Sequence, residues 1–146
     1  DMTVHILKMA VGVESVDHLR QLQTQRLSVQ RGAGEQQVLR HWTRNRPKRS
    51  DEIVNGGSLY WIIKGNIRAR QLITAIERRN EVETTKNCGF VLDPLVVSTV
   101  LQAARPIQGW RYLETSFVPQ DKDSSSETLD DMSEGMATEL RALGLL

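Results

Sequence analysis

The sequence has one cysteine, few aromatic residues and no long apolar run. Because Cys88 is the single cysteine among the 146 residues, the chain cannot form an internal disulfide, which is typical of proteins in a reducing compartment. Its uninterrupted apolar runs are only a few residues long, whereas a membrane-spanning helix needs roughly 20 residues. No charged start followed by an apolar segment marks a secretory signal. We therefore expect a cytoplasmic protein that does not contact membranes.

Signatures of catalysis and of metal binding are also missing. The three histidines fall on different predicted elements without the spacing of a metal site: His5, His18 and His41. We expect no metal and no cofactor, and the sequence has no glycine-rich phosphate loop. Cys88 could act as a nucleophile with His41 or His5, although a buried structural cysteine is commoner. Asp93 and Glu52 could serve as acids. Whether the protein is an enzyme therefore stays open.

The composition is that of an ordinary globular protein. With 39% hydrophobic and 25% charged residues, a chain of this length is expected to form one domain. We place this domain at residues 1–118. Residues 119–131 are polar and acidic and contain serines, which is typical of a linker. An apolar stripe then predicts a helix over residues 132–146, which docks on the domain or on a neighbouring subunit of a homodimer.

The net charge of +1 hides a strong segregation of charge along the chain. Residues 40–80 carry ten Lys and Arg against three acidic residues, a net charge of +7. Residues 113–146 carry eight acidic residues against two basic ones, a net charge of −6. One interpretation is a negatively charged partner, with the acidic tail shielding the basic face until that partner arrives. The other is a solvated surface of uneven charge.

Hydrophobic patterns predict an α+β fold. Residues 15–29 place apolar side chains near one helix face behind a Ser15 N-cap, and Ser50 caps a short helical turn at residues 51–54. Alternating or β-branched segments predict strands at residues 3–11, 38–43, 59–64, 67–76, 88–92, 95–101 and 110–113. These elements indicate a single domain built on a small mixed or antiparallel β pseudo-barrel, with flanking helices and a C-terminal helix.

The segment GGSLYWIIKG, residues 56–65, predicts the first arm of a β-hairpin. If its last glycine and the following Asn66 form a two-residue turn, Trp61 faces Arg70, so that a guanidinium lies across an aromatic ring. Residues 66–79 also fit an amphipathic helix, because four apolar residues recur there at helical spacing. We favour the strand.

Five strings of residues carry a family resemblance along most of the chain. In chain order they are LKMAVGVES, TRNRPKRSDEI, GGSLYWIIKG followed by RQ, CGFVLD and RPIQGWRYL. Together they resemble the bacterial family labelled domain of unknown function 1489, found mainly in alphaproteobacteria, and this resemblance implies little about function. The arrangement of a proline, a short helical turn and a strand with an aromatic pair is more distantly similar to PUA-like domains, a group that includes ASCH and EVE domains. That similarity implies binding of RNA or of a modified base.

Two segments are the strongest candidates for contact with a ligand. TRNRPKR, residues 43–49, crowds four cations around a proline, and the planar fork of arginine matches the geometry of phosphate. QGWR, residues 108–111, combines an amide that can read a base edge, a glycine, a ring that can stack and an arginine. The alternatives are a solvated basic loop and a tight structural turn.

We therefore expect a protein that binds RNA or a modified nucleotide through a basic face that contains aromatic residues. The candidate nucleic-acid-binding residues are Arg44, Arg46, Lys48, Arg49, Trp61, Lys64, Arg68, Arg70, Gln108, Trp110 and Arg111. Two alternatives stay open. One is a protein-interaction or dimerisation module that uses the C-terminal helix, and the other is a small nucleotide-processing hydrolase.

Overall fold

The computed structural model describes residues 2–80 and 82–122, and within them seven strands and two α-helices form an α+β fold. In chain order the elements are β1 (Val4–Met9), α1 (Val16–Gly32), β2 (Leu39–Thr43), α2 (Ser50–Val54), β3 (Ser58–Ile63), β4 (Asn66–Arg78), β5 (Cys88–Leu92), β6 (Val97–Ala103), β7 (Trp110–Glu114) and a 3-10 helix (Thr115–Phe117). The α+β class is confirmed. The helix expected over residues 132–146, and a dimer through it, lie outside the described residues. Within these residues, neither helix has the length and apolar character needed to cross a membrane.

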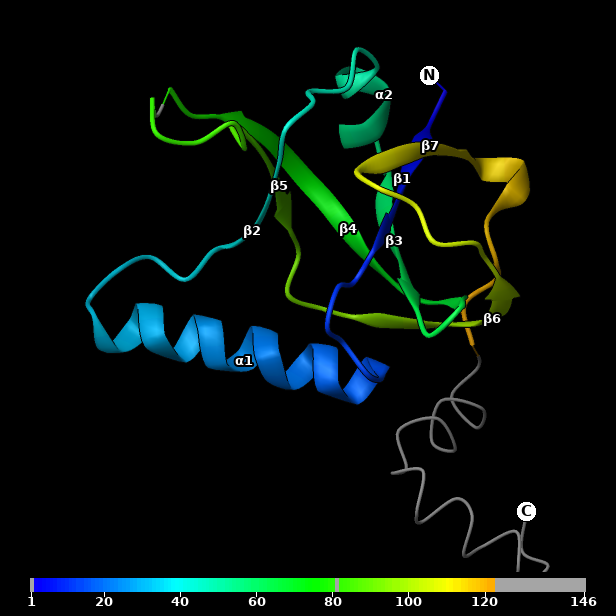
Figure 1. The fold of residues 1–146 in the computed structure, drawn as a ribbon, viewed down its shortest axis with the longest axis horizontal. Coiled ribbons are helices and arrows are strands. Elements are labelled where there is room, and N and C mark those ends of the chain that lie inside the picture. The colour runs from blue at the N-terminus through cyan, green and yellow to red at the C-terminus, as the bar shows by residue number, and fades with distance from the viewer. Residues whose placement is uncertain (1, 81, 123–146) are drawn as a thin grey trace, which may run out of the picture.

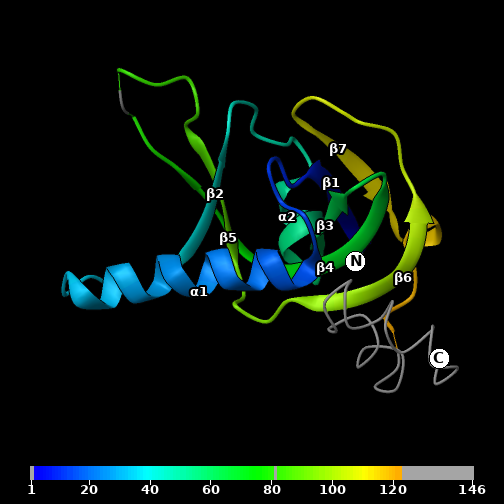
Figure 2. The same ribbon diagram turned by 60° about the horizontal axis from the view of Figure 1, so that its bottom comes forward.

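The strands form one open mixed sheet in the order β2-β5-β4-β3-β1-β7. β1 and β3 run parallel, because α1, β2 and α2 connect them, and the other neighbouring pairs are antiparallel. β4 is long enough to pair with β6 along its first residues and with β5 along its last ones. Figures 1 and 2 show β4 in the middle of the molecule, α1 along one side and the β4–β5 loop extending away from the body.

The β3–β4 hairpin forms, which confirms the strand alternative for β4, but its predicted register is wrong. The turn consists of Lys64 and Gly65, both with positive φ (52° and 76°), and so begins one residue earlier than expected. With this turn and a bulge in the hairpin, Trp61 lies opposite Ala69 and not opposite Arg70. Because side chains alternate between the two faces of a strand, the expected pair of ring and guanidinium does not form.

The first turn of α1 follows the predicted pattern. Ser15 is the N-cap, and its hydroxyl oxygen accepts a hydrogen bond from the His18 N–H at 3.0 Å. Val16 and Leu19 are buried in the core. The next buried position on this helix holds a polar residue, Gln23, which therefore needs a hydrogen-bonding partner inside the protein.

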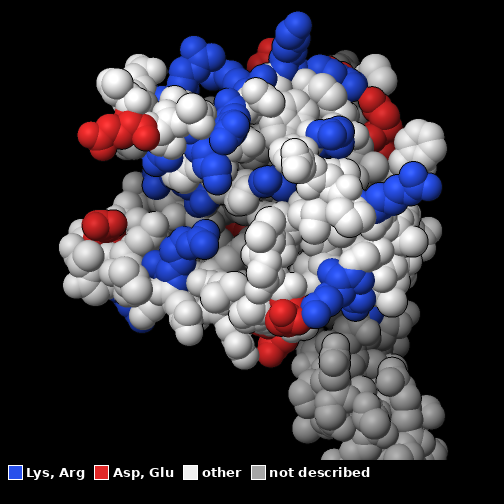
Figure 3. Space-filling view, viewed as in Figure 1, with Lys and Arg blue, Asp and Glu red and all other residues white. Residues whose placement is uncertain are grey.

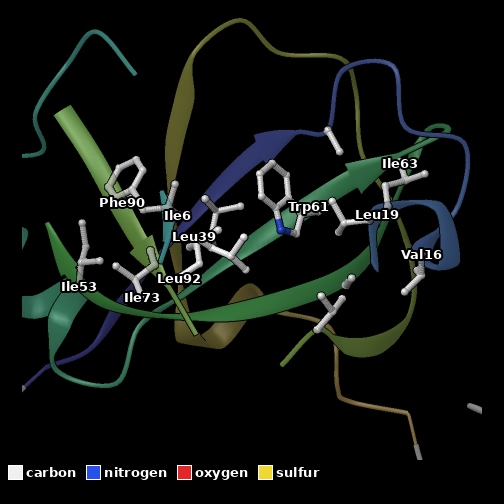
Figure 4. Packing of buried hydrophobic residues seen from close by; sticks show 14 of the residues in the cluster. Ile6, Val16, Leu19, Leu39, Ile53, Trp61, Ile63, Ile73, Phe90 and Leu92 are labelled. Atoms are coloured by element: carbon white, nitrogen blue, oxygen red, sulfur yellow. The ribbon is translucent and has the colours of Figure 1, made fainter. Parts of the chain in front are cut away.

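β3 is buried on both faces, which explains its uninterrupted apolar run. Leu59, Trp61 and Ile63 face the larger hydrophobic cluster, which also contains residues of α1. Tyr60 and Ile62 face a smaller cluster on the other side of the sheet. Figure 4 shows the larger cluster, to which both helices and five strands contribute side chains. The aromatic-containing segment GGSLYWIIKG therefore contains a strand at the centre of the core.

Gln71 of β4 is fully buried and forms four side-chain hydrogen bonds. Its amide oxygen accepts from Gln23 Nε2 at 2.8 Å and from Trp61 Nε1 at 2.9 Å. Its amide nitrogen donates to Gln23 Oε1 at 2.7 Å and to the Asp93 carbonyl at 3.0 Å. This one side chain therefore connects α1, β3, β4 and the turn between β5 and β6.

Replacing this amide should destabilise the protein strongly. In Gln71→Leu the Trp61 N–H and the Gln23 amide stay buried without partners, and each unsatisfied group costs about 1–3 kcal/mol. We expect the free energy of unfolding in urea to fall by about 3 kcal/mol or more. Gln25→Leu is the control for the Gln-to-Leu change itself, because Gln25 is an exposed residue of α1, and its free energy of unfolding should change by no more than about 0.5 kcal/mol. Equal stability of the two variants would contradict the role assigned to Gln71.

Candidate functional site

A cavity of about 690 Å³ opens between α1, β2 and the C-terminal end of β1. The loop before β7 contributes Gln108 and Gly109 to its wall, and the β4–β5 loop contributes Lys86. In Figure 3, Lys and Arg side chains gather on this face around a hollow between α1 and the β4–β5 loop. Sites for small molecules usually measure roughly 300–1,000 Å³, so the cavity has the size of a ligand site.

Five basic side chains line the cavity, and none of the described residues in its wall is acidic. They come from five separate segments: Lys8 of β1, Arg26 of α1, Arg40 of β2, Arg44 of the β2–α2 loop and Lys86 of the β4–β5 loop. Arg40 is neutralised, because its Nε lies 2.6 Å from Glu77 Oε2. The other four form no ion pair within the part of the chain that the structure describes. Four uncompensated positive charges around one space favour the entry of an anion.

His41 of β2 lies among these cations. Burial and then the charges of Lys8, Arg26 and Lys86 lower its pKa from 6.5 to about 4, so that the ring is neutral at pH 7. The ring stands edge-on to Trp61, with 5.2 Å between the ring centroids. Its Nε2 is buried and has no hydrogen-bond partner among residues 2–80 and 82–122. Most buried polar atoms in proteins are hydrogen-bonded, so the Nε2 of His41 is an exception within the cavity wall.

Lys8 stands on the inward face of β1, two residues after the buried Ile6. Burial and then the charge of Lys86 lower the pKa of its ammonium group. Its Nζ lies 3.5 Å from the Gly109 carbonyl. An anion beside Lys8 would raise the pKa of this ammonium group again, because a nearby negative charge favours the charged form of the amine.

The remaining wall of the cavity contains two tryptophans and three amides. Trp42 lies between the guanidinium of Arg79, 3.9 Å from the ring centroid, and Gly89, where an added Cβ would come within 2.8 Å of the ring. Trp61 is only 4% exposed and donates its Nε1 to Gln71. The rings therefore form an apolar wall and do not act as open stacking platforms. The amide side chains that line the cavity are Gln23, Asn45 and Gln108.

Residues 44–49, which we call the basic loop, join the cavity to a second depression. Arg44 and Asn45 line the cavity. A shallower depression of about 410 Å³ begins at the next residue and is lined by Arg46, Pro47, Lys48, Ser50, Asp51 and Arg78. Ser50 does not cap α2 as the sequence predicts, and its hydroxyl instead donates to the Pro47 carbonyl at 2.7 Å.

Two rings of β7 hold the basic loop in place. Trp110 donates its Nε1 to the Asn45 carbonyl at 2.8 Å. The Tyr112 hydroxyl accepts from the Arg49 N–H at 3.2 Å, and the two rings contact each other with their centroids 4.9 Å apart. Trp110, a candidate for base stacking, therefore positions the backbone of the basic loop.

Four of the candidate basic residues are occupied by partners within the fold. Three form ion pairs with N–O distances of 2.6–2.8 Å, and the fourth donates to a backbone carbonyl at 2.6 Å. These contacts are Arg49 with Glu52 and Glu114, Arg70 with Asp121, Lys64 with Glu14, and Arg68 with the carbonyl of Ile63. The two described acids of the acidic tail, Glu114 and Asp121, therefore pair with Arg49 of the basic loop and with Arg70 of β4, and neither pairs with a cation of the cavity.

The QGWR segment is divided between two roles. Gln108 and Gly109 line the cavity, and Gly109 takes a positive φ of 67° at this turn. Arg111 is exposed, and its Nη1 donates to the carbonyls of Gln108 and Trp110 at 3.0 Å. Of the four residues, the first two line the candidate site, Trp110 holds the basic loop, and Arg111 bonds to the carbonyls of the turn.

The candidate residues from the sequence do not include six polar residues of the cavity: Lys8, Gln23, Arg26, Arg40, His41 and Lys86. A signal for two of them was present. Lys8 continues the alternation of Val4 and Ile6 on the inward face of β1. Arg26 lies seven residues after Leu19, close to the helix side that carries the buried residues, although its own side chain is exposed. A cation in line with the buried positions of a strand or helix is the pattern that would have found this site.

The model of one protein family, described as protein of unknown function (DUF1489), matches residues 6–146 of the chain. The chain belongs to this family. The resemblance inferred from the five sequence strings is thereby confirmed. No curated protein and no solved structure matches the chain. The cavity is thus a candidate site in a DUF1489 protein, and its own residues are the basis for inferring its chemistry.

The lowered pKa of His41 makes the stability of this DUF1489 protein depend on pH. Between about pH 6.5 and pH 4 the unfolded chain takes up a proton at His41 and the folded protein does not, so stability falls as the pH falls through this window. The difference between 6.5 and about 4 corresponds to about 3 kcal/mol. Urea unfolding at pH 7 and at pH 4.5 should therefore show a smaller loss of stability for His41→Gln than for the unmodified protein.

His18→Gln is the control for replacing a histidine as such, because His18 lies outside the cavity wall. This variant should lose stability with falling pH as the unmodified protein does. Parallel curves of stability against pH for all three proteins would show that His41 is not held neutral by its surroundings.

Proposed function

We propose that this DUF1489 protein binds a nucleotide, with the phosphate and the base both inside the cavity. The observation that carries the proposal is the set of uncompensated cations, Lys8, Arg26, Arg44 and Lys86, which surround one space without an acidic residue among the described residues of its wall. Like charges repel, and a phosphate that contacts several of them relieves this repulsion.

The rest of the wall suits a base better than it suits a phosphate alone. Asn45 and Gln108 carry amides, which can donate to and accept from the polar edge of a base, whereas the Gln23 amide is already paired with Gln71. Trp61 and Leu39 belong to the apolar part of the wall, which a flat ring can contact. A free inorganic phosphate would leave these groups unused.

Binding is favoured over catalysis by the residue types in the cavity. The described wall offers no carboxylate, cysteine or serine, and its hydroxyl group, that of Thr43, belongs to a residue only 6% exposed. His41 is the group there with a pKa below 7, but no described acid or nucleophile lines the cavity with it. The distant similarity to PUA-like domains, which rests on the arrangement of sequence segments, points to the same class of ligand.

Calorimetric titration with the four ribonucleoside 5′-monophosphates, with the corresponding nucleosides and with inorganic phosphate tests this proposal. We expect at least one monophosphate to bind at least tenfold more tightly than its nucleoside and than phosphate alone. Lys8→Met keeps the apolar stem of the side chain and removes its charge, so it should weaken the binding of that monophosphate by about 10–100-fold, the effect of about 1.5–3 kcal/mol for one hydrogen bond to a charged group.

Arg31→Ala is the matched control, because Arg31 is an exposed cation of α1 that does not line the cavity, and affinity should not change. In the unmodified protein, a bound phosphate should also raise the pKa of His41, which a proton NMR titration measures. Failure of all four monophosphates to bind the folded protein, together with an unchanged pKa of His41, would refute nucleotide binding.

A further inference from the structure

The cavity extends along β2, and the second depression adjoins it at the end of β2 that leads into the basic loop. In the register of the strands, Thr43 of β2 pairs with Cys88 of β5, and Cys88 pairs with Arg78 of β4. The basic loop follows Thr43 directly, and Lys86 lies two residues before Cys88. Cations of the cavity and of the depression are therefore brought together by the same row of strand ends.

The second depression repeats the charge pattern of the cavity on the open surface. It is lined by Arg46, Lys48 and Arg78, together with one acidic residue, Asp51. None of the three basic residues forms an ion pair with a described residue. The basic loop thus carries uncompensated charge on both sides of Asn45, into the cavity through Arg44 and outward along the surface.

The backbone of the basic loop is held in place by contacts within the fold, without a ligand. Trp110 fixes the Asn45 carbonyl, and Tyr112 fixes the N–H of Arg49 at the other end of the basic loop. Pro47 between them is buried, and its carbonyl accepts from Ser50. A row of cations on a fixed backbone binds a regularly spaced anion with less loss of conformational entropy than a flexible basic tail does.

We infer that the nucleotide in the cavity is part of a single-stranded nucleic acid, whose neighbouring phosphates lie along the basic loop and over the second depression. This inference rests on the proposed function, since the cavity must first take a nucleotide. A free mononucleotide has its phosphate at one end only and leaves Arg46, Lys48 and Arg78 without a partner. A strand places further phosphates outside the cavity, where these three cations are.

A comparison of strand and mononucleotide tests the inference. The probes are a labelled single-stranded RNA of about six nucleotides, a DNA of the same sequence, and the monophosphate that the cavity binds best. We expect the RNA to bind at least tenfold more tightly than the monophosphate at low salt. Its affinity should also depend more steeply on salt, by about 0.7 in the logarithmic slope for each additional phosphate contact.

The double variant Lys48→Ala/Arg78→Ala distinguishes binding at the second depression from binding in the cavity. It should reduce RNA affinity at least tenfold and lower the salt slope by about 1.4, and it should leave binding of the monophosphate unchanged. Lys8→Met should lower the affinity for both the RNA and the monophosphate, and Arg31→Ala should lower neither affinity. Both substituted positions of the double variant are exposed, and its thermal midpoint checks that the protein is folded.

The outcomes distinguish this inference from the proposed function. If the monophosphate binds and the RNA binds no more tightly, the inference is wrong and the proposed function stands. If the RNA binds and Lys8→Met has no effect on it, the strand does not enter the cavity and the inference is also wrong. An oligoglutamate peptide that binds as tightly as the RNA would overturn the assignment to nucleic acid. Equal affinity for RNA and DNA would support a strand held by its backbone, and preference for RNA would support one whose 2′-hydroxyls are contacted as well.

Discussion

The reciprocal amide pair between Gln71 and Gln23 is the contact on which the position of α1 over the sheet depends. Both residues are buried, and neither can point its amide elsewhere without leaving a polar group unsatisfied. Trp61 donates to the same Gln71 oxygen, so the helix and the central strand share one acceptor. Gln23 and Trp61 also line the cavity, and the network that orders the core therefore fixes the inner wall of the candidate site as well.

The positive charge of the central segment is divided into two sets by this fold. One set is paired at the sheet, as in Arg49 with its two glutamates and Arg70 with Asp121. The other set forms no ion pair with a described residue, and it consists of Lys8, Arg26, Arg44 and Lys86 in the cavity and Arg46, Lys48 and Arg78 in the second depression. Two unit charges 4 Å apart repel by about 4 kcal/mol at an effective dielectric constant of 20, so cations gathered around one space lower stability. No carboxylate lines the described wall of the cavity, and Asp51 is the acidic residue among those that line the second depression, so most of this positive charge is not offset within the described fold.

Strand and helix positions were predictable from the sequence because they follow from local pattern. The Ser15 cap, the alternation in β1 and the apolar run of β3 each depend on a few consecutive residues. The hairpin register was not predictable in the same way. Lys64, a residue with a Cβ, adopts the left-handed conformation beside Gly65, and a bulge then shifts the partner of Trp61. Such a choice is made by packing on both faces of β3, which no window of sequence contains.

The candidate site was predictable in its outer part and not in its inner part, for a related reason. Arg44, Arg46 and Lys48 are adjacent in the chain, so their charge is visible in the sequence as one basic segment. Lys8, Arg26 and Lys86 lie far apart in the chain and meet only because the sheet order and the Gln71 network bring β1, α1 and the β4–β5 loop around one space.

The aromatic residues form part of the structural support of the candidate site. A chain with only seven aromatic residues uses two tryptophans in the cavity wall and places Trp110 and Tyr112 behind the basic loop. Trp61 and Trp42 are enclosed by their neighbours, so the rings contribute shape and an apolar contact and no open face on which a base can stack. Discrimination between bases would then rest on the amides of Asn45 and Gln108, which are directional and can distinguish the hydrogen-bonding edges of bases that stacking treats alike.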